Sequence, residues 1–333
     1  MQKMSEKPLY RAAENPTRNA DRRAGRFEEE ELISKTGRHP DMVIQFQDDA
    51  DDQHTSHYEG NWRHYFHKKL HIKNRLIRDW LSESLAMFLF MSLLLGGAAT
   101  AHFTGKQDDP MLTAVFHGFS AVFGIYVGAG VSGGIINPAL TFAVALLGRV
   151  SWRKCLVLVS AQYFGSFIAS AVVYLIYYES LQNYAKTADD NGEFLQKTAG
   201  IWSTFPKPYL SMTGAIFNQI FCTMLLSIGF LSISDHKNFR PTKGLFPFAV
   251  GLLIMTVFLA FSYSAGAAMN PARDLSPRLW SLIIGYGNEV FSHNDYKWFW
   301  IPWLFPYVGA LFGAVMYQIF VGVHWPDKQS TKR

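Results

Sequence analysis

The stretch Ser132-Gly133-Gly134-Ile135-Ile136-Asn137-Pro138-Ala139 has a counterpart later in the chain, Ser264-Ala265-Gly266-Ala267-Ala268-Met269-Asn270-Pro271-Ala272. In both stretches small residues lead into an Asn-Pro-Ala triplet, and each triplet opens an apolar run. Asparagine is a favoured helix N-cap, and proline suits the first helical position, where its missing N–H would have no partner. Each triplet therefore predicts a helix start, reached by backbone that can approach a neighbour closely.

The helix predicted after the first triplet is too short to cross a membrane. Its apolar run ends near Leu147, which gives about 15 Å of helix, half of a hydrocarbon core that is about 30 Å thick. A half-length helix after irregular backbone is tolerated at that depth only where it is buried in protein or lines a water-filled cavity. Two such helices in matching halves predict a site near the membrane midplane, between inverted repeats.

Six longer apolar segments accompany these two short ones. They cover about residues 80–103, 112–131, 154–178, 212–233, 244–263 and 299–322. Each is long enough to span a bilayer as a helix. The short helices fall between the second and third segments and after the fifth. We therefore expect an all-α membrane protein with six transmembrane helices and two re-entrant half-helices.

The two ends of the chain are polar. Residues 1–61 carry acidic clusters and few periodic apolar positions, so we expect a disordered cytoplasmic tail. Residues 62–78 are basic and rich in aromatics, and we expect this juxtamembrane segment to lie on anionic lipid. Residues 324–333 form a short basic tail.

Lysine and arginine also gather in the links before the third and fifth long segments. With six spans, these links and both termini fall on one side of the membrane, which the positive-inside rule makes cytoplasmic. The chain opens with no apolar signal segment, so the plasma membrane is the expected location. Both cysteines, Cys155 and Cys222, lie inside apolar runs and are expected to be buried packing residues without a disulfide.

The two triplets, with Arg273 and Asp274 directly after the second, resemble the major intrinsic protein (aquaporin) family. Within it the chain is similar to the aquaglyceroporin branch, whose signature is matched by Asp274, Arg278 and Pro302. The long segment before Trp298 also resembles the outer loop of that branch, whereas Trp303 fits the water-selective branch better.

The resemblance covers about residues 78–323 and implies the aquaporin fold. A channel domain at 79–323 would contain two inverted repeats, at about 79–180 and 212–322. Family members form homotetramers with one pore in each subunit, so the same assembly is implied here. The resemblance says nothing of residues 1–61.

The pore residues follow from the resemblance. The two pore motifs are Asn137, Pro138 and Ala139 in the first half and Asn270, Pro271 and Ala272 in the second. In the family, four positions counted from these motifs line the outer constriction, and here they are His117, Phe258, Ala267 and Arg273. We refer to these four as the constriction set. Water-selective members usually resemble Phe, His, a small residue and Arg, and glycerol-permeable members an aromatic, Gly, an aromatic and Arg, so this set matches neither.

Two further positions are implied to support the pore loops. A buried glutamate in each repeat holds a loop through backbone hydrogen bonds in the family; Glu83 matches it, and Gln219 departs from it. An amide oxygen can still accept such bonds, at lower strength. The other interpretation of Glu83 is an acidic residue at the start of a helix near the membrane interface. The other interpretation of Arg273 is a structural ion pair with Asp274.

The sequence favours a passive channel for water and small neutral solutes, glycerol foremost, that excludes protons and ions. A water-selective channel on an aquaglyceroporin frame is the alternative. A secondary transporter is disfavoured because the spans hold few charged residues beyond Glu83 and Arg273, and a membrane scaffold because the pore motifs are intact. No nucleophile–base pair, metal-ligand cluster or cofactor motif points to an enzyme, and no nucleic-acid partner is expected.

Overall fold

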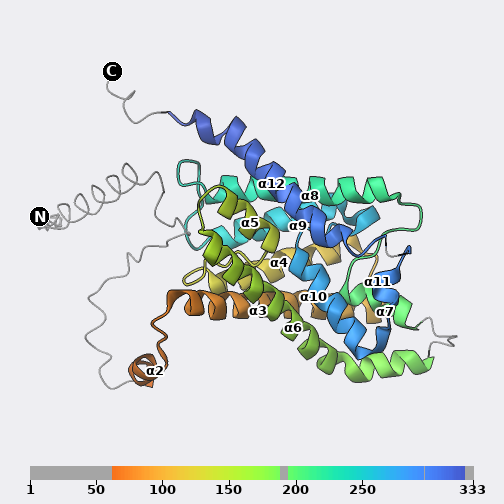
Figure 1. The fold of residues 1–333 in the computed structure, drawn as a ribbon. Helices are drawn as coiled ribbons and strands as arrows, with labels where there is room; N and C mark the ends of the chain where they lie inside the picture. Colours follow the sequence, from red (N-terminus) through yellow and green to blue (C-terminus); the bar gives the residue numbers. More distant parts are fainter. Residues whose placement is uncertain (1–61, 188–193, 296, 327–333) are drawn as a thin grey trace, which may run out of the picture. The chain divides into compact units, whose positions relative to one another are not determined.

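In the computed structural model, the described residues are 62–187, 194–295 and 297–326, and within these ranges the chain is helical and has no strand (Figure 1). The expected disordered tail at 1–61 and most of the tail at 324–333 lie outside the described residues.

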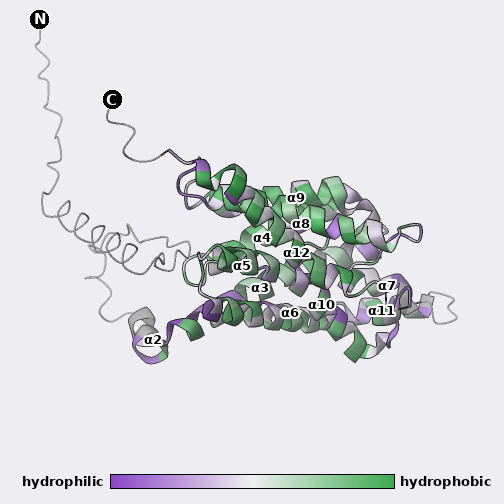
Figure 2. Ribbon diagram, turned by 45° about the horizontal axis from the view of Figure 1, so that its top comes forward, coloured by the Kyte–Doolittle hydropathy of each residue, from purple (hydrophilic) through white to green (hydrophobic). Residues whose placement is uncertain are grey.

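Six helices are long and apolar enough to cross a membrane, as the sequence predicts. They are α3 (Arg75–Phe103), α4 (Pro110–Gly128), α6 (Trp152–Thr187), α8 (Met212–Ser234), α9 (Phe246–Ala265) and α12 (Ile301–Phe320). Figure 2 shows hydrophobic residues along the lengths of these helices. The prediction of six spans is confirmed.

Several helix boundaries differ from the predicted spans: α3 begins five residues earlier and α4 ends three residues earlier. Helix α6 continues well past residue 178 to Thr187, because Leu181 is buried and Tyr184 packs edge-on against His102 and Phe103 at the end of α3. Helix α9 begins at Phe246, two residues later than predicted, since a proline in its first turn fits only there.

The two half-helices are α5 (Pro138–Leu146) and α10 (Pro271–Ser281), each begun by its Asn-Pro pair. The described chain also contains the short elements α2 (Trp62–Leu70), α7 (Phe194–Trp202), η2 (Leu282–Tyr286), α11 (Glu289–Ser292) and η3 (Gly322–His324). Helices α7 and α11 and the π-helical η2 gather at one end of the bundle, which we term the α7 end (Figure 1).

The two halves of the bundle pack in the same way. Helix α3 lies along α6 in the first half, and α8 lies along α12 in the second. Gly165 of α6 is pressed against the Ser84 carbonyl, directly after Glu83, and Gly309 of α12 is pressed against the Ile220 carbonyl, directly after Gln219. A side chain at either glycine would collide with backbone, so each repeat depends on the same close helix contact.

The repeats meet where α4 crosses α9. A Cβ atom at Gly118 would lie 2.8 Å from the Gly251 carbonyl oxygen, and one at Gly251 would lie 2.7 Å from the Gly118 carbonyl oxygen. This reciprocal contact is what a two-fold axis between two inverted repeats produces. It also sets α4 and α9 close enough for side chains beside the crossing to stack.

Candidate pore and its constriction

Asn137 and Asn270 begin the two half-helices from extended backbone. The side-chain oxygen of Asn137 accepts hydrogen bonds from the backbone N–H groups two and three positions further on, at 2.9 and 3.4 Å. The side-chain oxygen of Asn270 does the same, at 3.1 and 3.3 Å. These caps fix both amide groups at helix N-termini, where the partial positive charge of each helix is concentrated.

The same two side chains tie the pore loops together. The Asn137 Nδ2 donates to the Met269 carbonyl at 3.0 Å, and the Asn270 Nδ2 donates to the Ile136 carbonyl at 2.8 Å. An amide nitrogen carries two hydrogens, so each asparagine can offer one more N–H. Both asparagines keep 5–6% of their surface exposed, whereas Ala139 and Ala272, two residues further on, have no exposed surface.

The backbone before each asparagine takes the same unusual path. Ile136 and Met269, one residue before, have φ values of +47° and +52°. Gly134 and Ala267, three residues before, have φ values of +59° and +39°. Non-glycine residues in this left-handed region cost about 1–3 kcal/mol each and persist only where the surrounding structure holds them. The hydrogen bonds to these loops supply that hold.

Glu83 supports the first loop from inside the protein. Its Oε1 accepts from the Ile136 N–H at 2.7 Å and from the Gln162 side-chain amide at 2.8 Å, and that amide also donates to the Thr141 hydroxyl at 3.0 Å. Glu83 has no exposed surface. It is therefore a buried loop support in this structure, and the interpretation as an interfacial helix-start acid does not fit.

Gln219 occupies the matching place in the second half. Its Oε1 accepts from the Ala268 N–H at 3.0 Å, and its Nε2 donates to the Ala265 carbonyl at 3.0 Å. The amide therefore makes one accepting and one donating bond to the loop, where a carboxylate could only accept. Like Glu83, Gln219 is fully buried.

His117 and Phe258 form a stacked pair between α4 and α9. Their ring centroids are 3.8 Å apart and their planes differ by 22°. The His117 Nδ1 donates to the Thr113 carbonyl at 2.8 Å, so Nε2 of the neutral ring is an acceptor. Within the described chain this Nε2 has no hydrogen-bond partner, and both side chains keep 5–6% of their surface exposed.

Arg273 lies in the first turn of α10, and its Nη1 donates to the Trp202 carbonyl at 3.4 Å. The Arg273 Nε has no partner among the described residues, and 5% of the side chain is exposed. Ala267 has no exposed surface, so it is the one member of the constriction set that offers a solute nothing to contact.

Comparison with known proteins assigns the family. The family model described as Major intrinsic protein matches residues 71–317. The chain belongs to the major intrinsic protein family. Aquaporin-4 of Milnesium tardigradum is 67% identical over 296 residues, which cover 88% of this chain and 84% of that protein. Aquaporin-9 of Homo sapiens is 39% identical over 271 residues, covering 80% of this chain and 90% of that protein.

A solved structure supports the fold and the branch. The X-ray structure of the aquaglyceroporin from Plasmodium falciparum matches with a TM-score of 0.66 and 29% sequence identity, covering 74% of this chain and 97% of that one. The expected aquaporin fold and aquaglyceroporin resemblance are thus confirmed. Like other aquaporins, the chain is an integral membrane channel and not an enzyme.

Asp274 pairs with Arg278 in this aquaporin, and not with Arg273. The Asp274 Oδ1 lies 2.8 Å from the Arg278 Nη2, with both side chains fully buried. The Arg278 guanidinium also donates to the Thr204 and Val290 carbonyls, at 2.7 and 2.6 Å. The interpretation of Arg273 as an ion-pair partner of Asp274 is therefore wrong, because Arg278, one helical turn after Asp274, binds the Asp274 carboxylate.

This ion pair also binds Thr204, which follows α7 in the chain. The Asp274 Oδ2 accepts from both the backbone N–H and the hydroxyl of Thr204, at 2.8 and 2.5 Å. We term Asp274, Arg278 and Thr204 the loop clamp. Sequence reasoning identified the two charged members as a branch signature but missed Thr204 and Trp202, which lie in a long link where only an isolated tryptophan was a signal.

Pro302 is buried in the first turn of α12, where proline is tolerated. The next residue, Trp303, donates through Nε1 to the Tyr163 hydroxyl of α6 at 3.0 Å. The Tyr163 carbonyl in turn accepts from the Ser276 hydroxyl of α10 at 3.0 Å. These hydrogen bonds thus anchor the second half-helix, α10, to α6, and α6 to α12.

Proposed function

We propose that this aquaporin is a passive channel for water and small neutral solutes, with glycerol the foremost solute. One observation carries the proposal: Asn137 and Asn270 place two amide groups side by side at the N-termini of two half-helices. Each amide has an N–H to offer, and water or an alcohol oxygen can accept from both.

Exclusion of protons and ions follows from the same arrangement. Each half-helix carries roughly half a positive charge at its N-terminus, and both termini meet at the asparagines. A hydronium or metal cation there meets positive dipole ends and no compensating anion. Arg273, buried at the constriction, adds a full positive charge. A neutral solute meets no such barrier.

The constriction set supports hydroxyl compounds. The His117 Nε2 is an acceptor, and the Arg273 Nε is a donor, and neither atom has another partner in the described chain. A hydroxyl group both donates and accepts, so it can satisfy the two together. The stacked rings of His117 and Phe258 offer an apolar wall that suits the carbon chain of a polyol.

A water-selective channel is the second candidate. It is favoured by Phe258, which stands where glycerol-permeable members usually carry glycine and is packed against His117. The Phe258 side chain fills space that a glycine would leave open. The apolar wall therefore favours a three-carbon solute, whereas the bulk of Phe258 at this position disfavours it.

Stopped-flow light scattering on proteoliposomes separates the two candidates. Fast shrinkage under a sorbitol gradient, followed by fast re-swelling under a glycerol gradient, is the expected result. Fast shrinkage without re-swelling would instead establish the water-selective channel. The Arg273→Val protein is the control for the constriction, and it is expected to pass larger solutes and cations because it loses the charge and the bulk.

The placement in the cell belongs to the same proposal. We place the chain in the plasma membrane as a homotetramer with both termini cytoplasmic, because the basic links before α6 and α9 share a side with the basic segment 62–78. In that segment the described residues Lys68, Lys69 and Leu70 are exposed, as contact with anionic lipid requires. Native mass spectrometry tests the tetramer, and cysteine labelling at residue 68 in intact cells tests the side.

A further inference from the structure

The guanidinium of Arg273 has one hydrogen-bond partner within the described chain. Its Nη1 donates to the Trp202 carbonyl at 3.4 Å, and its Nε has no partner there. Trp202 is the last residue of α7, and the last carbonyls of a helix have no N–H partner within that helix. The C-terminus of a helix also carries a partial negative charge, which favours a cation. The position of Trp202 therefore decides where the constriction arginine is held.

The Trp202 side chain is fixed by a buried hydroxyl group. Its indole Nε1 donates to the Tyr286 hydroxyl at 3.0 Å, and that hydroxyl lies 2.8 Å from the Thr198 hydroxyl. Thr198 and Trp202 are four residues apart in α7, so their side chains lie on the same face of the helix. All three residues are at most 4% exposed. A buried indole N–H needs a partner, and Tyr286 supplies it.

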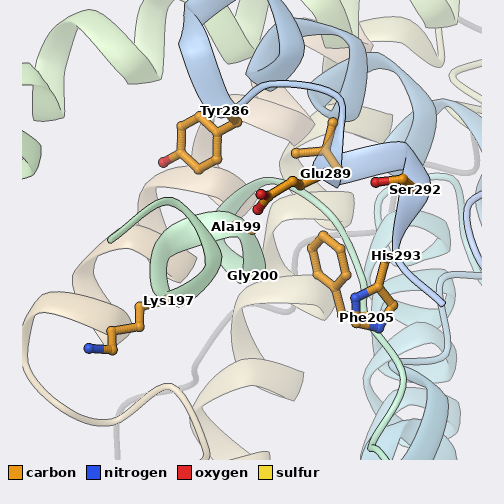
Figure 3. A pocket seen from close by; sticks show the side chains of 9 residues that line it. Lys197, Ala199, Gly200, Phe205, Tyr286, Glu289, Ser292 and His293 are labelled. Atoms are coloured by element: carbon orange, nitrogen blue, oxygen red, sulfur yellow. The ribbon is translucent and has the colours of Figure 1, made fainter. Parts of the chain in front are cut away.

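An unusual stretch of backbone brings Tyr286 to α7. Tyr286 is the last residue of the π-helical η2 and stands between Gly285 and Gly287, whose φ values are +101° and +67°. Such values favour glycine, because they strain a residue that has a Cβ atom. Figure 3 shows the Tyr286 ring beside the turns of α7. The two glycines thus allow the chain to place one tyrosine hydroxyl against Trp202, 84 residues earlier in the sequence.

The residues that follow Trp202 are held separately. Thr204 belongs to the loop clamp, and the Ser203 hydroxyl donates to the Asp274 carbonyl at 3.4 Å. These bonds fix the backbone after Trp202, but none of them reaches its indole ring. An indole has a single donor, so the bond to Tyr286 is the polar contact that sets how the Trp202 ring is turned.

Packing does not fix the Tyr286 ring on every side. The ring forms part of the wall of a cavity of about 470 Å³ at the α7 end (Figure 3). A side chain that borders open space has fewer neighbouring atoms to hold it than one packed all round. The hydrogen bonds of the Tyr286 hydroxyl therefore matter for the place of the ring as well as for that of Trp202.

We propose that Tyr286 is a positioning residue of the constriction, which keeps Arg273 in one place through Trp202 and so sets how sharply the channel separates solutes by size. The inference rests on the proposed function, in which Arg273 lines the pore. Two hydrogen bonds connect Tyr286 to Arg273, one to the Trp202 indole and one from the Trp202 carbonyl. Loss of the first leaves the buried indole N–H without a partner, so Trp202 shifts. Arg273 then keeps its charge but loses its fixed place.

Tyr286→Phe removes the hydroxyl and keeps the ring. The measurement is the permeability of proteoliposomes to erythritol relative to glycerol, which we term the size ratio. We expect the size ratio to rise about fivefold, equivalent to about 1 kcal/mol, the net contribution of a typical hydrogen bond. Exclusion of cations should persist because the charge of Arg273 remains, whereas Arg273→Val is expected to lose both. In a water-selective channel the size ratio is that of glycerol to water.

Tyr317→Phe is the matched control. Tyr317 is 2% exposed and its hydroxyl donates to Asp235 at 2.9 Å, so this variant also loses one buried tyrosine hydroxyl. Within the described chain Tyr317 has no hydrogen bond to Trp202 or to Arg273. We expect Tyr317→Phe to lose thermal stability in detergent, as Tyr286→Phe does, and to keep the size ratio of the wild type.

Two double variants show whether Tyr286 acts through Trp202 and Arg273. Trp202→Phe lacks the indole N–H, so it should raise the size ratio by itself, and adding Tyr286→Phe should raise it no further. In the Arg273→Val protein, adding Tyr286→Phe should leave the size ratio unchanged. Trp202→Phe also takes the place of Tyr286→Phe where the latter does not fold.

Three results would overturn the inference: a wild-type size ratio in folded Tyr286→Phe, an equal rise in Tyr317→Phe, or additive effects of Tyr286→Phe and Trp202→Phe. The second would assign the effect to lost stability, and the third to a route that bypasses Trp202. A wild type that passes neither water nor glycerol would refute the proposed function instead. The indole ¹H–¹⁵N signal that Trp202→Phe removes would then decide the contact alone, because it should shift in Tyr286→Phe.

Discussion

Asn137 and Asn270 each hold the loop that carries the other. The amide of Asn137 donates to the residue before Asn270, and the amide of Asn270 donates to the residue before Asn137. Each side chain also caps its own half-helix. The pore centre is therefore one hydrogen-bonded unit made of two segments that are far apart in the sequence, and a change at one asparagine acts on both loops.

Replacing one asparagine by aspartate separates these roles. In Asn137→Asp the carboxylate still caps α5, but it cannot donate to the Met269 carbonyl or to a solute. We expect a folded protein whose water permeability falls about tenfold, equivalent to about 1.4 kcal/mol. The negative charge also compensates the helix dipoles, so a cation conductance should appear in planar bilayers. An unchanged water permeability would show that Asn137 does not face the solute.

The two loop supports predict a second result. Gln219 already holds its loop with a neutral amide, so Glu83→Gln should keep the Ile136 hydrogen bond and leave permeation and thermal stability close to the wild type. Glu83→Ala leaves the buried Ile136 N–H without an acceptor, which costs about 1–3 kcal/mol. Thermal unfolding in detergent measures both, and similar losses in Gln and Ala variants would mean that the charge of Glu83 matters.

The stacked ring pair predicts the solute range. Phe258→Ala removes one of two rings at the constriction, so glycerol permeability should rise several-fold while water permeability changes less. Leu259→Ala is the matched control, because Leu259 is the next residue of α9 and is 38% exposed on the outside of the bundle. Equal glycerol permeability in both variants would place Phe258 away from the path of the solute.

The matching backbone of the two loops predicts an asymmetry between Gly134 and Ala267. In Gly134→Ala the new Cβ would lie 2.8 Å from the Ile125 carbonyl oxygen, at a φ of +59°. This combination should lower stability by about 1–3 kcal/mol. Ala267→Gly removes backbone strain at a φ of +39° but gains unfolded-chain entropy, so its stability should stay near the wild type. The melting temperatures of the two variants check this difference in detergent.

The cytoplasmic face, in the proposed orientation, predicts a pH effect at Asp235. Its Oδ2 accepts from the Tyr317 hydroxyl at 2.9 Å and from the Trp325 Nε1 at 3.3 Å, which ties the segment after α12 to the end of α8. Burial alone raises the pKa of Asp235. The Lys237 N–H, these two donors and the charge of Arg149 outweigh burial, so the pKa lies below its ordinary value.

A lowered folded-state pKa stabilises the protein above the ordinary value of about 3.9 and loses this effect as the pH falls through the folded value. The melting temperature of wild type should therefore exceed that of Asp235→Asn by a constant amount from pH 7 to about 5, and the gap should close below about pH 4. A gap that stays the same at acid pH would show that the hydrogen bonds, and not the charge, hold the segment.

Much of the fold could be predicted from the sequence because membrane helices are recognised by the length and hydropathy of their apolar segments. The spans near α3, α8 and α12 matched to within a few residues. The extension of α6 to Thr187 could not be predicted, because it depends on contacts of Tyr184 with residues at the end of α3. The helix α7 was likewise missed, since its nine residues are too few to be recognised as a membrane span.

The sequence by itself determined the number of spans, the two half-helices and the identity of the asparagines that begin them. These features are local: an Asn-Pro pair caps a helix wherever it stands, and an apolar run of sufficient length spans a bilayer. Only the tertiary structure decided that His117 stacks on Phe258, that Arg278 takes Asp274, and that Trp202 holds Arg273. His117 and Phe258 lie on elements that are far apart in the chain, and so do Trp202 and Arg273. Whether Arg273 or Arg278 pairs with Asp274 depends on which of the two arginines faces Thr204. Spacing along the chain carries none of that information.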